Sequence, residues 1–323
     1  QLEYDVILER VRLFKHAREL RVACADVLSK IPVMKVSDQL SWTAEAVVDG
    51  CVKYLEKAYD SEMQDNLAVI AFGKLGGLEL SYGSDLDLVY IAQNEKQSNY
   101  CNKSNIPYVV KISKFAQRLT QMLTLQTVSG KLYEVDTRLR PDGESGTIAP
   151  SFSFVDNYYQ SRAWTWELQA LVRARCVAGS AAVREQFAEM RERIICQPRD
   201  VKKLSIDVAE MRGKMLETKA SKIPGVFHLK NDEGGITDIE FMVQYAVLAH
   251  ACKDKSLCEY SDNVRLLERL ADSGFISSSM ATEMIDIYCR FRNIMHHMAL
   301  QAQKPEATKA EYANEVKVVR DCW

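Results

Sequence analysis

The chain has 323 residues, 47% of them hydrophobic, so it can bury more than one core, and two or three domains are expected. Its 42 basic and 44 acidic residues give a formal net charge of −2, which provides no global positive field to hold a nucleic-acid backbone. A protein substrate therefore fits better than RNA, and no nucleic-acid partner is expected.

The cysteines and the hydropathy pattern indicate a cytoplasmic protein. Nine cysteines are scattered without a C-x-x-C pair, which favours reduced thiols. No apolar stretch approaches the roughly 18 residues that span a bilayer, and the first residues lack a signal-peptide pattern. We therefore expect neither export nor a membrane partner.

Residues 1–64 are expected to form a helical arm. Apolar side chains recur there at helical spacing, and Ile31-Pro32 breaks the pattern. The apolar positions are Val6, Leu8, Val11, Leu13, Val47, Val48, Val52 and Leu55.

From Asn66 the hydrophobic period shortens to that of β-strands. Strands are expected over Leu67 to Phe72 and Leu86 to Ala92, followed by a polar stretch from Gln93 to Asn105. A helix comes next, and a third strand follows over Lys131 to Leu139. The apolar face of that helix comprises Val109, Ile112, Phe115, Leu119, Met122 and Leu123. This order predicts a small mixed sheet with helices against it in a domain of residues 65–178.

Beyond Gly179 the pattern is nearly all helical, and a helical bundle is expected over residues 179–323. Helical runs are expected over Val183 to Ile195, Val201 to Glu217, Ile239 to Ala251, Val264 to Ala271 and Met280 to Gln301. Within DEGGITDIEF, Gly234-Gly235 before Thr237 and Asp238 indicates a loop that enters a helix with an N-cap. The predicted fold class is α+β.

Three aspartates carry the strongest chemical signal. Side chains alternate along a strand, so Asp85 and Asp87 project from one face about 7 Å apart. On the third strand, Leu132, Glu134, Asp136, Arg138 and Arg140 would share one face. Asp136 could therefore complete a three-carboxylate cage. Hard oxygen ligands suit Mg²⁺, which usually binds through few carboxylates plus substrate phosphates, so the pattern implies a nucleoside triphosphate.

Glycines precede the acidic pair where the backbone has to turn after Leu67 to Phe72. Gly73, Gly76 and Gly77 could let the backbone approach a phosphate closely, and Lys74 and Ser84 could add donors.

Several further residues admit two interpretations. Arg138 and Arg140 could bind the triphosphate or the leaving pyrophosphate, or one of them could pair with Asp85, Asp142 or another carboxylate. For Arg173 and Arg175 the structural pairing is favoured, and for Glu134 a solvent or salt-bridge role. Trp164 and Trp166 could stack on adenine, but core packing is favoured. For His296 and His297 a packed or surface role is favoured over catalysis.

These residues resemble known families at two levels. A glycine pair upstream of Asp-x-Asp on a strand resembles the DNA polymerase beta-like nucleotidyltransferase superfamily. More closely, successive blocks over roughly residues 1 to 300 resemble glutamine synthetase adenylyltransferase. The blocks are GKLGGLELSYGSDLDL, YEVDTRLRPDGESG, AWTWELQALVRAR, DEGGITDIEF and SDNVRLLERL. Gly76-Gly77 lies closer to Asp85 than the superfamily pattern has it, and Gly73-Lys74 has the better spacing.

The resemblance implies a reaction and partners. The family is bifunctional, with one half that adenylylates glutamine synthetase and a related half that removes the AMP by phosphorolysis. The segments YGSDLDL and TWELQALVRAR resemble the C-terminal, adenylyl-transferring half more than the N-terminal one. Residues 65–178 are therefore expected to be its nucleotidyltransferase domain. Asp85 and Asp87 would bridge two Mg²⁺ ions, ATP would be the substrate, and Asp136 would be a ligand and the candidate base. Glutamine synthetase is the implied substrate protein, with the PII protein and glutamine as implied effectors.

Three other functions remain open on the sequence. This half could instead carry out the phosphorolytic removal of AMP, because both halves use similar metals. It could be a regulatory module that senses ATP without turnover, although the three aspartates count against this. Addition of nucleotides to RNA is disfavoured by the charge balance.

Overall fold

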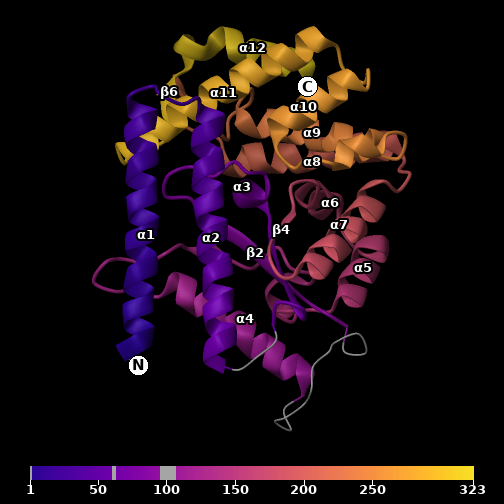
Figure 1. The fold of residues 1–323 in the computed structure, drawn as a ribbon. Coiled ribbons are helices and arrows are strands. Elements are labelled where there is room, and N and C mark those ends of the chain that lie inside the picture. The colour runs from indigo at the N-terminus through magenta and orange to yellow at the C-terminus, as the bar shows by residue number, and fades with distance from the viewer. Residues whose placement is uncertain (1, 60–62, 95–106) are drawn as a thin grey trace. The chain divides into compact units, whose positions relative to one another are not determined.

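The computed structural model describes residues 2–59, 63–94 and 107–323, and it divides into two compact units (Figure 1). The first unit contains Gln1–Ala163 and Arg173–Ile194, and the second contains Trp164–Val172 and Ile195–Trp323. The predicted α+β class is confirmed, because helices predominate around a small mixed sheet. Most of the expected polar stretch from Gln93 to Asn105 lies outside the described residues. The expected domain boundaries, 1–64, 65–178 and 179–323, stay a prediction.

The first unit is built on a four-stranded sheet with the order β3-β2-β1-β4. Strand β1 is antiparallel to both β2 and β4, whereas β2 and β3 are parallel. The strands are β1 Leu67–Ala71, β2 Leu86–Ala92, β3 Val135–Asp136 and β4 Arg175–Ala178. The predictions of β1 and β2 are confirmed. Strand β4 was not predicted.

The third strand is much shorter than the predicted Lys131 to Leu139. Leu132 and Tyr133 are both buried, which breaks the expected alternation, and the Tyr133 N–H donates to Leu123 O at 3.0 Å instead of to a neighbouring strand. Only Val135–Asp136 pairs with β2. Beyond Asp136 the chain turns away, so Arg138 and Arg140 are not strand residues.

Helices cover both faces of this sheet. Figure 1 shows α1 and α2 on one side of it and α5 and α7 on the other. The helices of this unit are α1 Leu2–Val27, α2 Val33–Tyr59, the short α3 Gly73–Gly76, α4 Tyr108–Thr124, α5 Phe152–Ser161 and α7 Ala181–Ile195, with a 3₁₀ turn η2 at Gly143–Ser145. The predicted break at Ile31-Pro32 is confirmed. Val6, Leu13 and Val109 were expected on apolar faces but are exposed, because α1 and α4 bury narrower stripes than expected.

The core on the α2 side fixes the direction of the acidic residues. Leu86, Leu88 and Tyr90 of β2 enter the same hydrophobic cluster as the buried faces of α2 and α4. Because side chains alternate along a strand, Asp87 projects from the opposite face.

The second unit is mainly helical. Its helices are α6 Thr165–Val172, α8 Val201–Lys219, α9 Ile236–His250, α10 Asn263–Asp272, α11 Ser278–Leu300 and α12 Ala313–Cys322, with 3₁₀ turns η3 Lys255–Cys258 and η4 Lys309–Tyr312. The predicted helical runs correspond to α7 to α11. The antiparallel pair β5 Val226–His228 and β6 Glu306–Thr308 was not expected in a nearly all-helical region. Among the described residues, no helix is both long and apolar enough to cross a bilayer.

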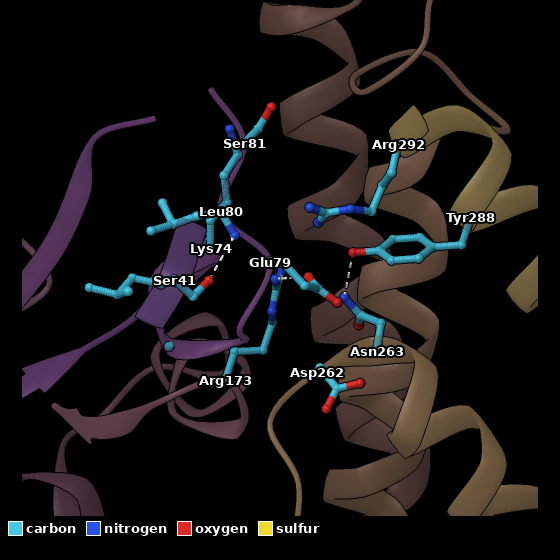
Figure 2. A network of polar contacts seen from close by, with 12 residues as sticks. Ser41, Lys74, Glu79, Leu80, Ser81, Arg173, Asp262, Asn263, Tyr288 and Arg292 are labelled. Atoms are coloured by element: carbon cyan, nitrogen blue, oxygen red, sulfur yellow. Dashed lines mark hydrogen bonds and ion pairs between the residues drawn. The ribbon is translucent and has the colours of Figure 1, made fainter. Parts of the chain in front are cut away.

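Helix α6 is tied to this second unit by side-chain hydrogen bonds. Thr165 Oγ1 donates to Asp207 Oδ2 of α8 at 2.7 Å, and Gln169 Nε2 donates to Gln244 Oε1 of α9 at 3.3 Å. In α10 and α11, the buried Asn263 Nδ2 donates to Tyr288 Oη at 2.9 Å (Figure 2).

The DEGGITDIEF segment is a helix entry, as predicted, but its cap differs from the expected one. Gly235 occupies the N-cap position without a side-chain cap. Asp238 instead accepts a hydrogen bond from the Gly234 N–H at 2.5 Å and pairs with the buried Arg212. Arg212 also donates to the carbonyls of Asn231 and Asp232, at 3.0 and 3.1 Å. These contacts give the segment a structural role.

A buried ion pair holds the turn after β1 in the first unit. Arg173 pairs with Glu79, and the two side chains are 6% and 0% exposed (Figure 2). The glycines of this turn make room for it. A Cβ at Gly77 would lie 2.8 Å from Nη2 of Arg173, and one at Gly76 would lie 2.0 Å from the Arg173 carbonyl oxygen. Nearby, the Leu80 N–H donates to Ser41 Oγ at 3.3 Å.

We expect Glu79→Gln to lower the free energy of unfolding by about 3–5 kcal/mol, because it removes the carboxylate that pairs with the buried Arg173 charge. Glu45→Gln is the matched control, since Glu45 pairs with Arg175 at 2.5 Å but the two side chains are 21% and 28% exposed. Its loss should be no more than about 1 kcal/mol. Urea unfolding followed by circular dichroism measures both. Equal losses of unfolding free energy in the two variants would show that burial does not increase the contribution of the Glu79–Arg173 pair to stability.

Candidate active site

Strand pairing places two of the three predicted aspartates next to each other. In the parallel pair of β2 and β3, Leu86 lies opposite Val135 and Asp87 lies opposite Asp136. Adjacent strands are about 4.8 Å apart. Two carboxylates at neighbouring positions of adjacent strands can share one cation.

Asp85 lies one residue before β2 and is exposed, whereas Asp87 is partly buried. One residue separates Asp85 from Asp87, so the two side chains would point to the same face if the extended geometry of β2 continued to Asp85. The structure therefore pairs Asp87 with Asp136 at the sheet edge and leaves Asp85 at the open end of the strand.

Gly73 is fitted to the Asp87 carboxylate. Its φ is +54°, in the left-handed region that favours glycine, and a Cβ at this position would lie only 2.2 Å from Asp87 Oδ2. The backbone at the start of α3 thus lies against the carboxylate. Of the three predicted glycines, Gly73 is the one that the structure brings to the acidic site, whereas Gly76 and Gly77 lie against Arg173.

Arg138 engages the Asp136 carboxylate. Its Nε donates to both carboxylate oxygens at 3.0 and 2.9 Å, and its Nη2 donates to Oδ2 at 2.5 Å. Its backbone N–H donates to Oδ1 at 2.8 Å. Hydrogen bonding from Arg138, opposed by partial burial, holds the pKa of the Asp136 carboxyl below its usual value. Asp136 is therefore ionised at neutral pH, as a metal ligand must be, but the low pKa disfavours it as the general base that the sequence suggested.

Arg140 is used differently. Its Nη1 donates to the carbonyl and hydroxyl oxygens of Thr137 at 2.8 and 3.0 Å. Its Nη2 and Nε reach the carbonyls of Glu144 and Gly146 at 3.2 and 3.3 Å. Of the two interpretations for these arginines, the structure shows Arg138 on a carboxylate and Arg140 holding the loop after β3.

Ser84 and Lys74 meet in the turn before β2. Ser84 Oγ accepts from the Ser81 N–H at 3.1 Å and from Lys74 Nζ at 3.4 Å. The Ser84 hydroxyl thus fixes the turn that delivers Asp85 and Asp87. Its predicted contact with the triphosphate remains a prediction, as does that of Lys74.

The donor set suits Mg²⁺, although the carboxylates are not gathered into a cage. Within residues 2–59, 63–94 and 107–323, no group of three or more His, Cys, Asp and Glu side chains is placed to hold a metal ion. Asp136 faces Arg138 instead. Asp87 and Asp136 nevertheless offer hard oxygen atoms at neighbouring positions, which is the ligand type that Mg²⁺ prefers. The three-aspartate metal site stays a prediction.

The structure also shows the contacts or exposure of the other residues whose roles the sequence left open. Glu134 is 63% exposed and pairs with Lys131, as expected. The prediction that the two tryptophans pack in the core is wrong, because the side chain of Trp164 is 70% exposed and that of Trp166 is 37% exposed. His296 is buried, with Nε2 lying 3.3 Å from Arg292 Nη2, which confirms a packed role.

Glu79 is the residue at this site that the sequence did not single out. Glu79 follows Gly76-Gly77 within GGLEL. A single acidic residue between two leucines could have indicated a buried carboxylate that needs a charged partner. Its partner Arg173 lies 94 positions along the chain.

We expect Gly73→Ala to cost more stability than Gly83→Ala. Both glycines have positive φ, +54° and +67°, but a Cβ at Gly83 meets nothing within 4 Å. Gly83→Ala should therefore cost only the backbone strain, about 1–2 kcal/mol. Gly73→Ala also has to displace the Asp87 carboxylate, so its urea midpoint should fall further at an unchanged slope. A smaller or equal shift for Gly73→Ala would show that Asp87 gives way without cost.

Comparison with known proteins gives matches to two family models. Residues 2–190 match the family model GlnE, glutamate-ammonia ligase adenylyltransferase. Residues 204–309 match a second model, GlnD PII-uridylyltransferase.

Among curated proteins, the chain is similar to bifunctional glutamine synthetase adenylyltransferase/adenylyl-removing enzymes. It is 42% identical to that of Thioalkalivibrio sulfidiphilus over 99% of this chain and 34% of the relative. It is 40% identical to that of Pasteurella multocida over 99% of this chain and 33% of the relative. The chain thus spans about a third of the length of these relatives. Because this family model matches more than half of the chain, the chain belongs to the glutamate-ammonia ligase adenylyltransferase family.

Proposed function

We propose that this chain transfers AMP from ATP to a tyrosine hydroxyl of glutamine synthetase in a Mg²⁺-dependent reaction that releases pyrophosphate. The observation that carries the proposal is the β2–β3 register, which sets Asp87 opposite Asp136 with Gly73 against the Asp87 carboxylate. The names of the relatives support the choice of substrate protein. The motifs YGSDLDL and TWELQALVRAR support assignment to the C-terminal, adenylyl-transferring half.

In the proposed reaction, the tyrosine oxygen forms a bond to the α-phosphorus of ATP, and the bond between that phosphorus and the bridging oxygen to the β-phosphate breaks. The hydroxyl proton passes to water, and pyrophosphate leaves. A tyrosine hydroxyl has an unperturbed pKa near 10, so charge developing on its oxygen needs a nearby cation. Mg²⁺ held by Asp85, Asp87 and Asp136 would supply that charge and neutralise the triphosphate.

The side chains have separate tasks in this scheme. Asp87 is held in place by β2 and by the close approach of Gly73, so its carboxylate needs little reorganisation on binding. Arg138 carries a guanidinium fork that matches phosphate oxygens. Arg140 fixes the loop from Thr137 to Gly146 and thereby the position from which Arg138 acts.

The second candidate is phosphorolytic removal of AMP from adenylylated glutamine synthetase. The relatives' names combine transfer and removal, and this chain covers only a third of their length. The same aspartates would serve either reaction, because each is a displacement at the phosphorus of the AMP group. We also propose that the PII protein and glutamine regulate this chain, because the family resemblance implies them as effectors.

The first test uses α-labelled ATP, Mg²⁺ and unmodified glutamine synthetase. Asp136→Asn and the double variant Asp85→Ala/Asp87→Ala should each lower labelling at least about 100-fold, because a metal ligand supplies several kcal/mol of charge stabilisation. Glu134→Gln is the control, since the Glu134 side chain is exposed and, within the described residues, forms an ion pair with Lys131. It should label normally.

Three outcomes are distinguishable. Wild-type labelling by Asp136→Asn would overturn the assignment of Asp136. Absence of label together with phosphate-dependent ADP release from adenylylated glutamine synthetase would select the removal reaction. Binding of ATP with neither product would identify a sensing module.

A further inference from the structure

Arg138 occupies the position that a cation bound to Asp136 would need. The guanidinium and the backbone N–H of one residue together engage both oxygens of the Asp136 carboxylate, at 2.5 to 3.0 Å. Asp136 therefore has its charge neutralised within its own loop. A metal ion could reach this carboxylate only by displacing the fork.

The fork also lies in the field of the facing strand. Asp87 is opposite Asp136, and its negative charge acts on Arg138 as well. The guanidinium that binds Asp136 is thus also attracted by the carboxylate at the facing strand position.

Arg138 is nonetheless placed to leave. Its side chain is 69% exposed, whereas that of Asp136 is 23% exposed. In the described part of the chain, its side-chain hydrogen bonds all go to Asp136. Arg140 differs in this respect, because four oxygens of its own loop hold it. An exposed ion pair of this kind is weak enough to exchange partners.

We propose that Arg138 couples metal binding to nucleotide binding, by holding Asp136 until a polyphosphate takes over its guanidinium. The inference rests on the proposed function for the identity of the polyphosphate, a nucleoside triphosphate. Phosphate oxygens form the same bidentate contacts as a carboxylate and carry more charge, so they compete well for the fork. The transfer removes the guanidinium from both oxygens of Asp136, and Oδ1 keeps only the Arg138 backbone N–H, at the moment when a cation is needed beside the triphosphate.

This coupling makes Arg138 a positioning residue as well as a phosphate ligand. Without nucleotide, the cation site at Asp87 and Asp136 is weak because its second carboxylate is occupied. With nucleotide, both ligands are available. Metal and nucleotide should therefore each strengthen the binding of the other, and by linkage the factor is the same in both directions.

The test measures Mn²⁺ binding to the whole chain by electron paramagnetic resonance of the free ion, with and without a non-hydrolysable ATP analogue. Without nucleotide, Arg138→Ala should bind Mn²⁺ about 5-fold or more tightly than wild type, within the usual range of coupling between sites. Addition of the analogue should tighten Mn²⁺ binding strongly in wild type and little in Arg138→Ala. Arg138→Lys, which keeps the charge but loses the fork, should lie between the two.

Two controls separate this mechanism from a general charge effect. Lys131→Ala removes a positive charge three residues from Glu134 and five from Asp136, and it should leave Mn²⁺ affinity without nucleotide within about 2-fold of wild type, as expected for an exposed pair. Asp136→Asn/Arg138→Ala should lose the gain of Arg138→Ala. A gain that survives in this double variant, or that Lys131→Ala reproduces, overturns the proposal.

The readout does not depend on the reaction. If Arg138→Ala binds Mn²⁺ no more tightly than wild type, the coupling is wrong even when AMP transfer is observed. If the gain appears but glutamine synthetase is never labelled, the coupling stands and the proposed reaction fails.

Discussion

The site depends on a parallel pairing that is only two residues long. Leu86 and Asp87 of β2 lie opposite Val135 and Asp136 of β3, so one short stretch of register decides whether two carboxylates meet. Strand β2 is fixed on its other edge by five paired residues of β1, and Leu86, Leu88 and Tyr90 anchor it in the core. Because a shift of one residue would turn Asp87 into that core, the apolar packing of β2 enforces the geometry of the acidic pair.

The glycines of the turn after β1 serve two different constraints. Gly73 allows the backbone to lie against Asp87, and Gly76 and Gly77 allow it to lie against Arg173. The buried Arg173–Glu79 pair in turn connects this turn to the residue that precedes β4 by two positions. Close backbone contacts and a buried charge pair therefore stabilise the turn that contacts the acidic site. This support explains how a partly exposed carboxylate can keep one orientation.

Local patterns predicted the parts of the fold that depend on neighbours in sequence. Strand β2, helix α8 and the break at Pro32 follow from period and composition, and the Asp85-Leu86-Asp87 motif indicated the candidate site. Features set by distant partners were not accessible. Strand β4 forms by pairing with β1 about a hundred residues away, Arg173 finds Glu79 across a similar separation, and the alternation over Lys131 to Leu139 is interrupted because Leu132 and Tyr133 are both needed in the core.

The discontinuous path of the chain constrains how this architecture can recombine. Helix α6 lies in sequence between two segments of the first unit, yet Thr165 and Gln169 bond to α8 and α9 of the second. A chimaera that exchanged only residues 195–323 with a relative would give α6 foreign partners at Asp207 and Gln244. Exchange of the second unit between homologous genes therefore has to carry residues 164–172 as a separate insert, which makes a single crossover an inefficient route to new combinations.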